Sequence, residues 1–354
     1  MRRTWTWAVT ALICAFLPLL LFACGGDDDT ESSAAASTTT AATTAAAKKP
    51  LRVGLVTDIG QLNDRGFNFL AYEGVKQAER RLGVDGRVLE SRSAADYIPN
   101  LTSLARQGYD LVIGVGFAQG EAIDAAAARF PRARFAIIDV DHGSLAHKPK
   151  NVVGLLFREQ EAGYLAGYLA ALAEKRRPGA DVISSVGGMK EPPVDRFIAG
   201  YQAGARKALP GVKLLNDYSQ DWDDQARCKE VALDHIARGA GVVFQVAGGC
   251  GLGALDAASE RKVWGVGVDA DQSFLGPHVL TSAQKKVDRA VFLTIQSIAK
   301  GTWKGGRNSV FGLRQDGVGL GKISARVPAT DRKALAALRD DIARGSVEIP
   351  TRVG

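Results

Sequence analysis

Short apolar segments alternate with amphipathic stretches along the chain from Pro50 onward. Near-continuous apolar runs are typical of strands buried on both faces of a parallel sheet, and the stretches between them repeat their apolar positions with the period of a helix. In the first half of the chain the expected strands cover residues 51–57, 87–91, 109–116, 132–139 and 151–157, and the expected helices cover 66–82, 96–107 and 118–129.

The alternation starts again after the fifth strand. The next expected elements are a helix over 158–175, strands over 180–188, 212–218, 240–248 and 262–269, and later helices over 284–300 and 331–344. Two such series predict an α/β protein with two doubly wound, Rossmann-like lobes. Ligands of these sheets bind beyond the carboxyl ends of the strands, so the residues that follow each strand are the candidates for a binding site.

The first 23 residues read as an export signal, because Arg2 and Arg3 precede an apolar run that ends in "LFAC". The order resembles a bacterial lipobox, in which Cys24 is acylated and becomes the new N-terminus. The alternative is a single membrane-spanning helix, since the run is nearly long enough. Pro18 and the linker that follows favour the lipoprotein, anchored by its lipid to the extracytoplasmic face of the cell membrane.

Residues 24–49 are expected to form a disordered tether that starts at the lipidated cysteine. From residue 25 the segment holds no aromatic residue and no aliphatic residue larger than Ala, so it cannot bury enough apolar surface to offset the entropy of ordering. The chain from Pro50 onward is long enough for two α/β lobes of ordinary size.

The formal net charge is +7, of which the predicted cleavage removes Arg2 and Arg3 and leaves +5. The basic residues are scattered and lack the aromatic interleaving of a nucleic-acid surface, so the charge suggests solubility and compatibility with anionic surfaces, not nucleic-acid binding. Outside the signal and the lipobox two cysteines remain, Cys228 and Cys250, and an exported compartment permits a disulfide between them.

Polar and aromatic side chains gather after the expected strands. Asp58 and "GQLNDRGFN" follow the first strand, Phe117 the third and Asp139 the fourth, and the second series adds "GGMKEPPVDRF", "DYSQDWDD", "AGGCGLG" and "GVDADQ". Aromatic faces, carboxylates and bare glycine backbone suit a cleft for a flat, hydroxylated ligand. Each also has an ordinary structural explanation: Asp58 and Asp64 as helix caps, the glycines as tight turns, and Trp222 as a surface anchor.

The motifs together resemble the basic membrane protein family of bacterial lipoproteins. The resemblance covers residues 50–354 and rests on "VTDIGQLNDRGFN", "GVGF", "FAIID", "FREQEAGYLAGYLAA", "GGMKEPPVDRFIAGYQAG", "VFQVAGGCGLG", "GVDADQ", "TSAQKKVD" and "GVGL", in this order. It implies a substrate-binding protein with the type I periplasmic-binding fold, which captures purine nucleosides for the permease of an ABC transporter. No cofactor, metal or catalytic residue is implied, and we expect a monomer.

The resemblance also implies roles for individual residues. Phe67 and Trp222 would stack on the two faces of a base, and Asp139 would accept hydrogen bonds from its edge. Asp269 would accept from ribose hydroxyls and Lys285 would donate to them. The complete expected ligand-binding set is Asn63, Asp64, Phe67, Asn68, Phe117, Asp139, Trp222, Gly248, Gly249, Asp269 and Lys285.

The opening loop departs from the family's usual "GGIDDKSFN", because this chain reads "GQLNDRGFN". Asn63 replaces a carboxylate with an amide, which can donate as well as accept, and this leaves the preferred base open. Lobe 1 is expected to comprise residues 50–156 plus about 284–305, and lobe 2 residues 157–280 plus about 310–354. Crossings between them are expected near 155–158, 278–284 and 306–320.

Other classes fit less well. The opening stretch lacks most of the carboxylates with which a nucleoside hydrolase binds calcium. "GGCGLG" followed by Asp269 resembles a dinucleotide-binding unit in placement, but the glycine spacing differs from G-x-G-x-x-G. A non-transport sensor of the same fold remains an alternative for the function, and a sugar or another small polar solute for the ligand.

Overall fold

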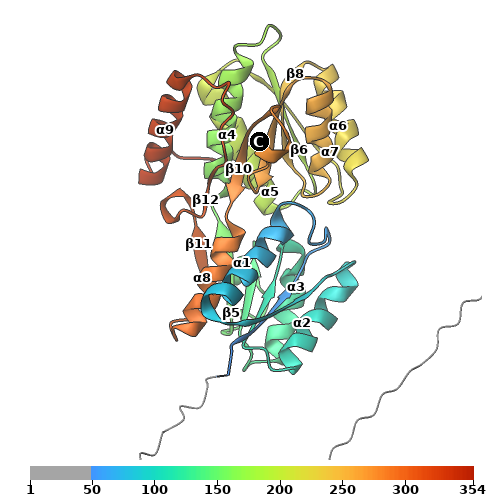
Figure 1. Cartoon of the computed structure of the whole chain (residues 1–354), viewed down its shortest axis with the longest axis vertical. Helices are drawn as coiled ribbons and strands as arrows, with labels where there is room; N and C mark the ends of the chain where they lie inside the picture. The colour runs from blue at the N-terminus through green and yellow to red at the C-terminus, as the bar shows by residue number, and fades with distance from the viewer. Residues whose placement is uncertain (1–48) are drawn as a thin grey trace, which may run out of the picture. The chain divides into compact units, whose positions relative to one another are not determined.

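Two six-stranded sheets form the framework of the computed structural model, which describes residues 49–354 (Figure 1). The predicted signal peptide 1–23, the lipidation site Cys24 and the tether up to residue 48 lie outside the described residues. Within residues 49–354, none of the helices is long and apolar enough to cross a membrane.

The first sheet is wholly parallel, with the strand order β11-β5-β4-β3-β1-β2. Its strands are β1 (Arg52–Val56), β2 (Asp85–Leu89), β3 (Leu111–Gly114), β4 (Phe135–Ile138), β5 (Val152–Phe157) and β11 (Arg307–Phe311), and its helices are α1 (Phe67–Leu82), α2 (Tyr97–Arg106), α3 (Gly120–Arg129) and α8 (Val287–Ala299). Leu55, Ile113 and Ile137 are fully buried, as expected for central strands that are covered on both faces. We call this sheet and its helices lobe 1.

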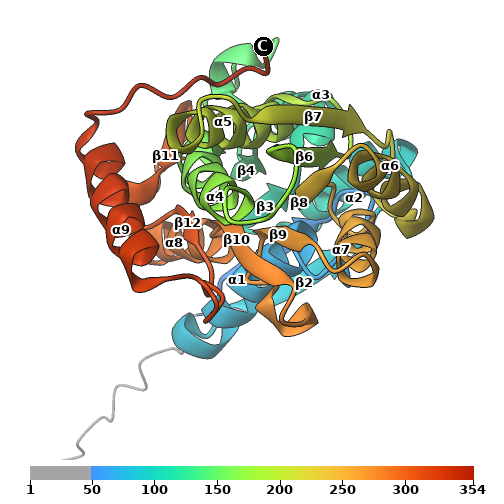
Figure 2. The same ribbon diagram turned by 90° about the horizontal axis from the view of Figure 1, so that it is seen from above.

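The second sheet has the order β12-β10-β9-β8-β6-β7 and is parallel except for the β10–β12 pair. Its strands are β6 (Val182–Gly187), β7 (Lys213–Tyr218), β8 (Ala240–Val246), β9 (Trp264–Asp269), β10 (Val279–Lys285) and β12 (Val318–Leu320), and its helices are α4 (Glu159–Glu174), α5 (Pro192–Ala208), α6 (Gln225–Ala237), α7 (Gly251–Glu260) and α9 (Ala329–Arg344). We call this sheet and its helices lobe 2. The view from above shows α9 on the outer side of α4 (Figure 2).

The chain passes between the lobes at three places. It leaves β5 for α4, which packs against α5 and β10; it leaves β10 for α8, which packs against α1; and it leaves β11 for β12. The predicted helix over 284–300 began too early, because β10 runs to Lys285 and α8 starts at Val287. The expected second segment of lobe 1, about 284–305, also ended too early, since β11 pairs with β5 at 307–311.

Helices α4 and α5 approach each other until their backbones touch. A Cβ on Gly163 or Gly167 would lie 2.2 or 1.9 Å from a backbone oxygen of α5, and one on Gly200 or Gly204 would lie 2.2 or 2.0 Å from a backbone oxygen of α4. Each helix therefore needs two glycines four residues apart on the shared face. This explains the glycines in "EAGYLAGY" and "IAGYQAG" without a direct role in binding.

Residues 49–354 form one compact unit that contains every described helix, strand and apolar core. The structure also contains a disulfide between Cys228 and Cys250, whose Cα atoms are 5.5 Å apart. Both cysteines belong to the small core between α6, α7 and β8. Because the unit has its own cores and its own covalent link, the fragment 49–354 is suited to experiments in solution.

Candidate functional site

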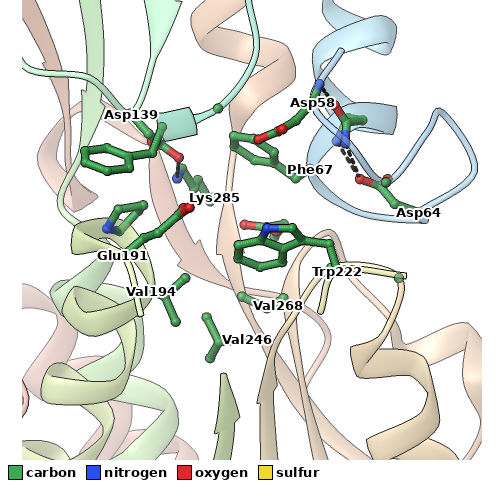
Figure 3. Close-up of a pocket in the computed structure, with 18 of the residues that line it drawn as sticks. Asp58, Asp64, Phe67, Asp139, Glu191, Val194, Trp222, Val246, Val268 and Lys285 are labelled. Carbon is green, nitrogen blue, oxygen red and sulfur yellow. Dashed lines mark hydrogen bonds and ion pairs between the residues drawn. The ribbon is translucent and has the colours of Figure 1, made fainter. Parts of the chain in front are cut away.

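A single cavity collects residues from the carboxyl ends of strands in both sheets (Figure 3). It encloses about 630 Å³ of space, including the part that opens to solvent. The lining is Asp58, Ile59, Gly60, Asp64, Phe67, Asn68, Gly116, Phe117 and Asp139 from lobe 1, and Glu191, Pro193, Val194, Phe197, Trp222, Val246, Gly248, Gly249, Val268, Asp269 and Lys285 from lobe 2.

Phe67 and Trp222 face each other from opposite lobes (Figure 3). Phe67 is the first residue of α1, and Trp222 lies in the loop between β7 and α6. The indole passes over Gly188, where an added Cβ would lie 2.4 Å from Cζ3 of Trp222. Two aromatic faces on opposite walls suit a flat ring system, since π faces prefer stacked partners.

The Trp222 loop is fastened to the glycine turn after β8. The Cys250 amide donates a hydrogen bond to the Trp222 carbonyl at 2.8 Å, and the disulfide ties Cys250 to α6. Gly248 adopts a positive φ of 56°, which favours glycine, and Gly249 follows it along the same wall. The "AGGC" turn therefore places bare main chain beside the indole.

Asp139 and Asp269 occupy equivalent positions, one in each lobe. Asp139 follows β4 and Asp269 ends β9, and their φ angles are +70° and +60°. Side chains other than glycine rarely adopt this left-handed conformation, and such strain collects at ligand sites. Oδ1 of Asp139 is buried and accepts no hydrogen bond from residues 49–354, so it is available to a donor in the cavity.

The opening loop forms a second polar wall. The Asp64 carboxylate accepts hydrogen bonds from the backbone amides of Gly66, Asn68 and Phe69 at 2.7–3.1 Å, and thereby caps the start of α1. The Asn68 side-chain oxygen accepts from the Asp58 amide at 2.9 Å. The capping role that an Asp before a helix commonly has therefore holds for Asp64, which also lines the cavity.

Asp58 lies against the backbone of the neighbouring strand end. A Cβ on Gly116 would be 2.1 Å from Asp58 Oδ2, so only glycine fits there. Asp58 Oδ1 accepts hydrogen bonds from the Tyr97 hydroxyl and from the Ile59 amide. This contact accounts for the second glycine of "GVGF".

Lys285 joins the two lobes through a buried ionic network. Its ammonium lies 2.6 Å from Asp139 Oδ2 and 3.0 Å from Glu159 Oε1, and only 2% of its side chain is exposed. Glu159 in turn lies 2.6 Å from Nε of Arg196. Burial opposes the charge of Lys285, but the two carboxylates outweigh it and hold the pKa of this ammonium above its usual value.

The cavity as a whole is strongly acidic. Five carboxylates line it, at positions 58, 64, 139, 191 and 269, against one lysine. Burial is the main cause that raises the pKa of Asp58 to about 6 and that of Asp269 to about 7. Burial, with the charge of Asp58 next in size, raises the pKa of Glu191 to about 7.

The structure gathers most of the predicted site residues around this cavity. Ten of the eleven line it, namely Asp64, Phe67, Asn68, Phe117, Asp139, Trp222, Gly248, Gly249, Asp269 and Lys285. Asn63 does not: it is exposed in the opening loop, whereas its neighbour Asp64 is buried and caps α1. We therefore leave Asn63 out of the proposed ligand contacts.

The expected ligand-binding set omitted Asp58 and Glu191, although both lie in stretches that follow strands, and the sequence did not predict the apolar floor. Val194, Phe197, Val246 and Val268 form that floor. Glu191 precedes Pro192, the first residue of α5, in the turn after β6, so its place at a strand end was a usable signal. The floor residues gave no signal, because apolar positions in a strand or helix look alike whether they face a core or a cavity.

Comparison with known proteins agrees with this geometry. The family described as "ABC transporter substrate-binding protein PnrA-like" matches residues 51–352. The "ABC transporter nucleoside-binding protein BmpA" of Lactococcus lactis is 34% identical over 327 residues, which cover 86% of this chain and 90% of that protein. "Basic membrane protein A" of Borreliella afzelii is 31% identical, with 84% and 91% covered.

Solved structures show the same fold. A solute-binding protein of an ABC transporter system from Aeropyrum pernix superposes with a TM-score of 0.78 at 26% identity, covering 86% of this chain and 94% of that one. Its counterpart from Conexibacter woesei gives 0.68 at 26% identity, covering 85% and 99%. The fold and the cleft thus define a substrate-binding protein of an ABC transporter. The chain belongs to the PnrA-like family of these proteins, which confirms the resemblance drawn from its motifs.

Proposed function

We propose that the chain captures a purine nucleoside between its lobes and delivers it to the permease of an ABC transporter. The observation that carries the proposal is the pair Phe67 and Trp222, which present aromatic rings from opposite lobes to one cavity. The relative from Lactococcus lactis, whose name states that it binds nucleosides, supports the same ligand class.

The base would lie between the two rings. The free Oδ1 of Asp139 would accept a hydrogen bond from an N–H on the base edge, and Asp269 would accept from ribose hydroxyls. Lys285 donates a hydrogen bond to Asp139 and forms an ion pair with Glu159, so it keeps donor capacity for the ligand. Asn68, Phe117, Gly248 and Gly249 would complete the contacts.

The charge of the cavity argues for a nucleoside over a nucleotide. Five lining carboxylates face one lysine that is already paired, so a phosphate group would meet uncompensated negative charge in a site of low dielectric. A neutral nucleoside instead brings several hydrogen-bond donors, which carboxylates accept well.

The proposed location is the extracytoplasmic face of the membrane, where lipid on Cys24 would hold a monomer beside its permease. Four relatives support the location, since three from Pyrococcus species are named lipoproteins and one from Borreliella is named a membrane protein. A ligand sensor of the same fold would need the same cleft. Transport of the nucleoside into cells by the neighbouring permease distinguishes a transport receptor from such a sensor.

A thermal-shift panel tests the ligand class. Fragment 49–354 is unfolded and refolded once to remove carried-over ligand, and its melting temperature is measured with guanosine, inosine, adenosine, uridine, free bases, ribose and hexoses. A ligand at about 100 times its dissociation constant stabilises a protein by roughly 2.7 kcal/mol, which is a clear shift. We expect purine nucleosides to raise the melting temperature and ribose to leave it unchanged; a shift with hexoses alone would replace the nucleoside with a sugar.

A further inference from the structure

Eight exposed cations gather at one edge of lobe 1, in the three loops that precede β4, β5 and β11 or in the residues that directly flank these loops. They are Arg129, Arg132, Arg134, Lys148, Lys150, Lys300, Lys304 and Arg307. We call this set the basic edge. In the sequence these residues are far apart and look scattered, and the fold brings them together.

Strand register places the three loops side by side. In a parallel sheet all amino ends lie at one edge, and Arg134, Lys150 and Lys304 each come shortly before a strand. Hydrogen bonds join the loops directly: the Phe135 amide donates to the Asn151 carbonyl at 2.8 Å, and the Gly306 amide donates to the Val152 carbonyl at 2.7 Å. The clustering therefore follows from the backbone, not from flexible side chains.

The charge of the basic edge is not balanced locally. The segments 127–134, 145–151 and 299–307 contain no Asp or Glu, and none of the eight cations forms an ion pair with another part of residues 49–354. Two acids at the amino ends of the same sheet, Asp85 and Asp110, contact the side chain and the backbone amide of Arg52 at the start of β1. His147 pairs with Asp124.

The far end of lobe 2 has both paired and unpaired cations. Arg176 and Arg177 are paired with Asp331 and Glu174, at 2.6 and 2.7 Å, whereas Lys207 and Lys213 form no ion pair within the described chain. A cluster of unpaired cations repels itself, and its stability cost is compensated when it meets an anionic surface. The gathering of eight unpaired cations in segments that contain no Asp or Glu therefore indicates a binding role for the basic edge.

We propose that the basic edge docks on an anionic phospholipid surface. The described chain enters lobe 1 at this edge, because residues 49–51 lead directly into β1 (Figure 1). The anchoring at Cys24 that is part of the proposed function would bring the same edge to the membrane. Trp303 lies among the cations, half-buried and 5.9 Å from the Arg134 guanidinium, and aromatic rings with a polar edge suit the headgroup region.

Docking in this way would fix the orientation of the cleft. The basic edge is at the amino ends of the lobe 1 strands, and the cavity is at their carboxyl ends. The lobe would therefore stand between the membrane and the cavity, which would stay open to dissolved ligand.

Vesicle flotation tests the proposal with fragment 49–354, which lacks any lipid. The fragment is mixed with vesicles of phosphatidylcholine alone or with a substantial share of phosphatidylglycerol, at about 0.1 M salt, where the screening length is about 10 Å. We expect binding to the anionic vesicles only. The triple variant Arg132→Glu, Lys150→Glu, Lys304→Glu should lower the partition coefficient by at least about tenfold, since each basic residue near an anionic surface contributes substantially.

The matched control makes the same charge change on lobe 2, with Lys207→Glu, Lys213→Glu and Lys333→Glu, which are exposed and form no ion pair within the described chain. It should bind like the wild type. If both triple variants lose the same amount of vesicle binding, the effect depends on net charge alone and the proposal is overturned. Absence of wild-type binding to anionic vesicles would overturn it as well. Nucleoside affinity is measured in parallel and should be equal in all three proteins, so failure of the membrane proposal stays separate from failure of the ligand proposal.

Discussion

Lys285 and Asp139 form a buried ion pair across the two lobes, with 2.6 Å between Nζ and Oδ2. Lys285 ends β10 of lobe 2, and Asp139 follows β4 of lobe 1. Glu159, at the start of α4, forms an ion pair with the same ammonium at 3.0 Å. The pair thus lies where the chain passes between the lobes, and both of its residues line the binding cavity.

Replacing Lys285 should destabilise the fold. The variant Lys285→Met leaves Asp139 and Glu159 buried without their cation, and removal of one partner of a buried pair typically costs about 3–5 kcal/mol. Urea unfolding of fragment 49–354 measures the loss. The adjacent Lys286→Met is the control, because its partner Asp316 is exposed and such pairs contribute roughly 0–1 kcal/mol. Equal stabilities of the two variants would contradict the structural role of Lys285.

Glu191 should make stability depend on pH. Its folded pKa is about 7, well above the ordinary value of 4.5, so the native state binds the proton more tightly than the unfolded chain does. The stability that protonated Glu191 contributes to the folded state is therefore fully present below about pH 4.5 and is lost as the pH rises toward 7. The variant Glu191→Gln removes this loss, so its melting temperature relative to wild type should be higher at pH 8 than at pH 5.

Calorimetric melting of ligand-free protein at these two pH values checks the prediction. Glu121→Gln, which changes an exposed carboxylate on α3, supplies the control and should shift the melting temperature equally at both pH values. A Glu191→Gln variant with the same behaviour as this control would mean that the cavity does not perturb Glu191.

Removal of Trp222 should weaken ligand binding much more than it weakens the fold. Stacking of a base on an aromatic side chain contributes about 1–3 kcal/mol, so Trp222→Ala should raise the dissociation constant for a purine nucleoside roughly five- to 150-fold. Trp303→Ala, at the opposite edge of lobe 1, should leave the affinity unchanged. Isothermal titration measures the nucleoside affinity of both variants. Unchanged affinity in Trp222→Ala would show that Trp222 does not stack on the base.

The disulfide should affect both stability and binding. Its cysteines are 22 residues apart, and a loop of this size contributes about 3 kcal/mol in the chain-entropy model. The double variant Cys228→Ala, Cys250→Ala should lose about this much in urea unfolding. Without the disulfide, the turn whose Cys250 amide bonds the Trp222 carbonyl loses its covalent link to α6, so nucleoside affinity should fall as well. Full affinity with reduced stability would confine the disulfide to a structural role.

The two-lobe fold could be predicted from the sequence because each buried strand is a continuous apolar run. "LRVGLVT" and "RARFAIID" contain β1 and β4 near their centres. Strands β11 and β12 escaped prediction because "RNSVF" and "VGL" are short or mixed in polarity, and they are recognisable only through their pairing with β5 and β10.

The site could be predicted wherever a polar or aromatic residue follows a strand, as at Asp139. Chain position alone did not say which way each side chain of the opening loop turns, so Asn63 was included although only Asp64 faces inward. It also did not reveal that Lys285 is held by two carboxylates, because Glu159 comes from a different part of the chain.

The most direct measurement is an isothermal titration of guanosine, inosine and adenosine into refolded fragment 49–354. The proposed function predicts one site per chain with a dissociation constant below about 1 μM for at least one of the three, and no heat with ribose alone. The contradicting result is the absence of binding heat with all three purine nucleosides, from a protein whose cooperative melting shows that it is folded. This result would exclude the nucleoside assignment and leave only the family and the fold.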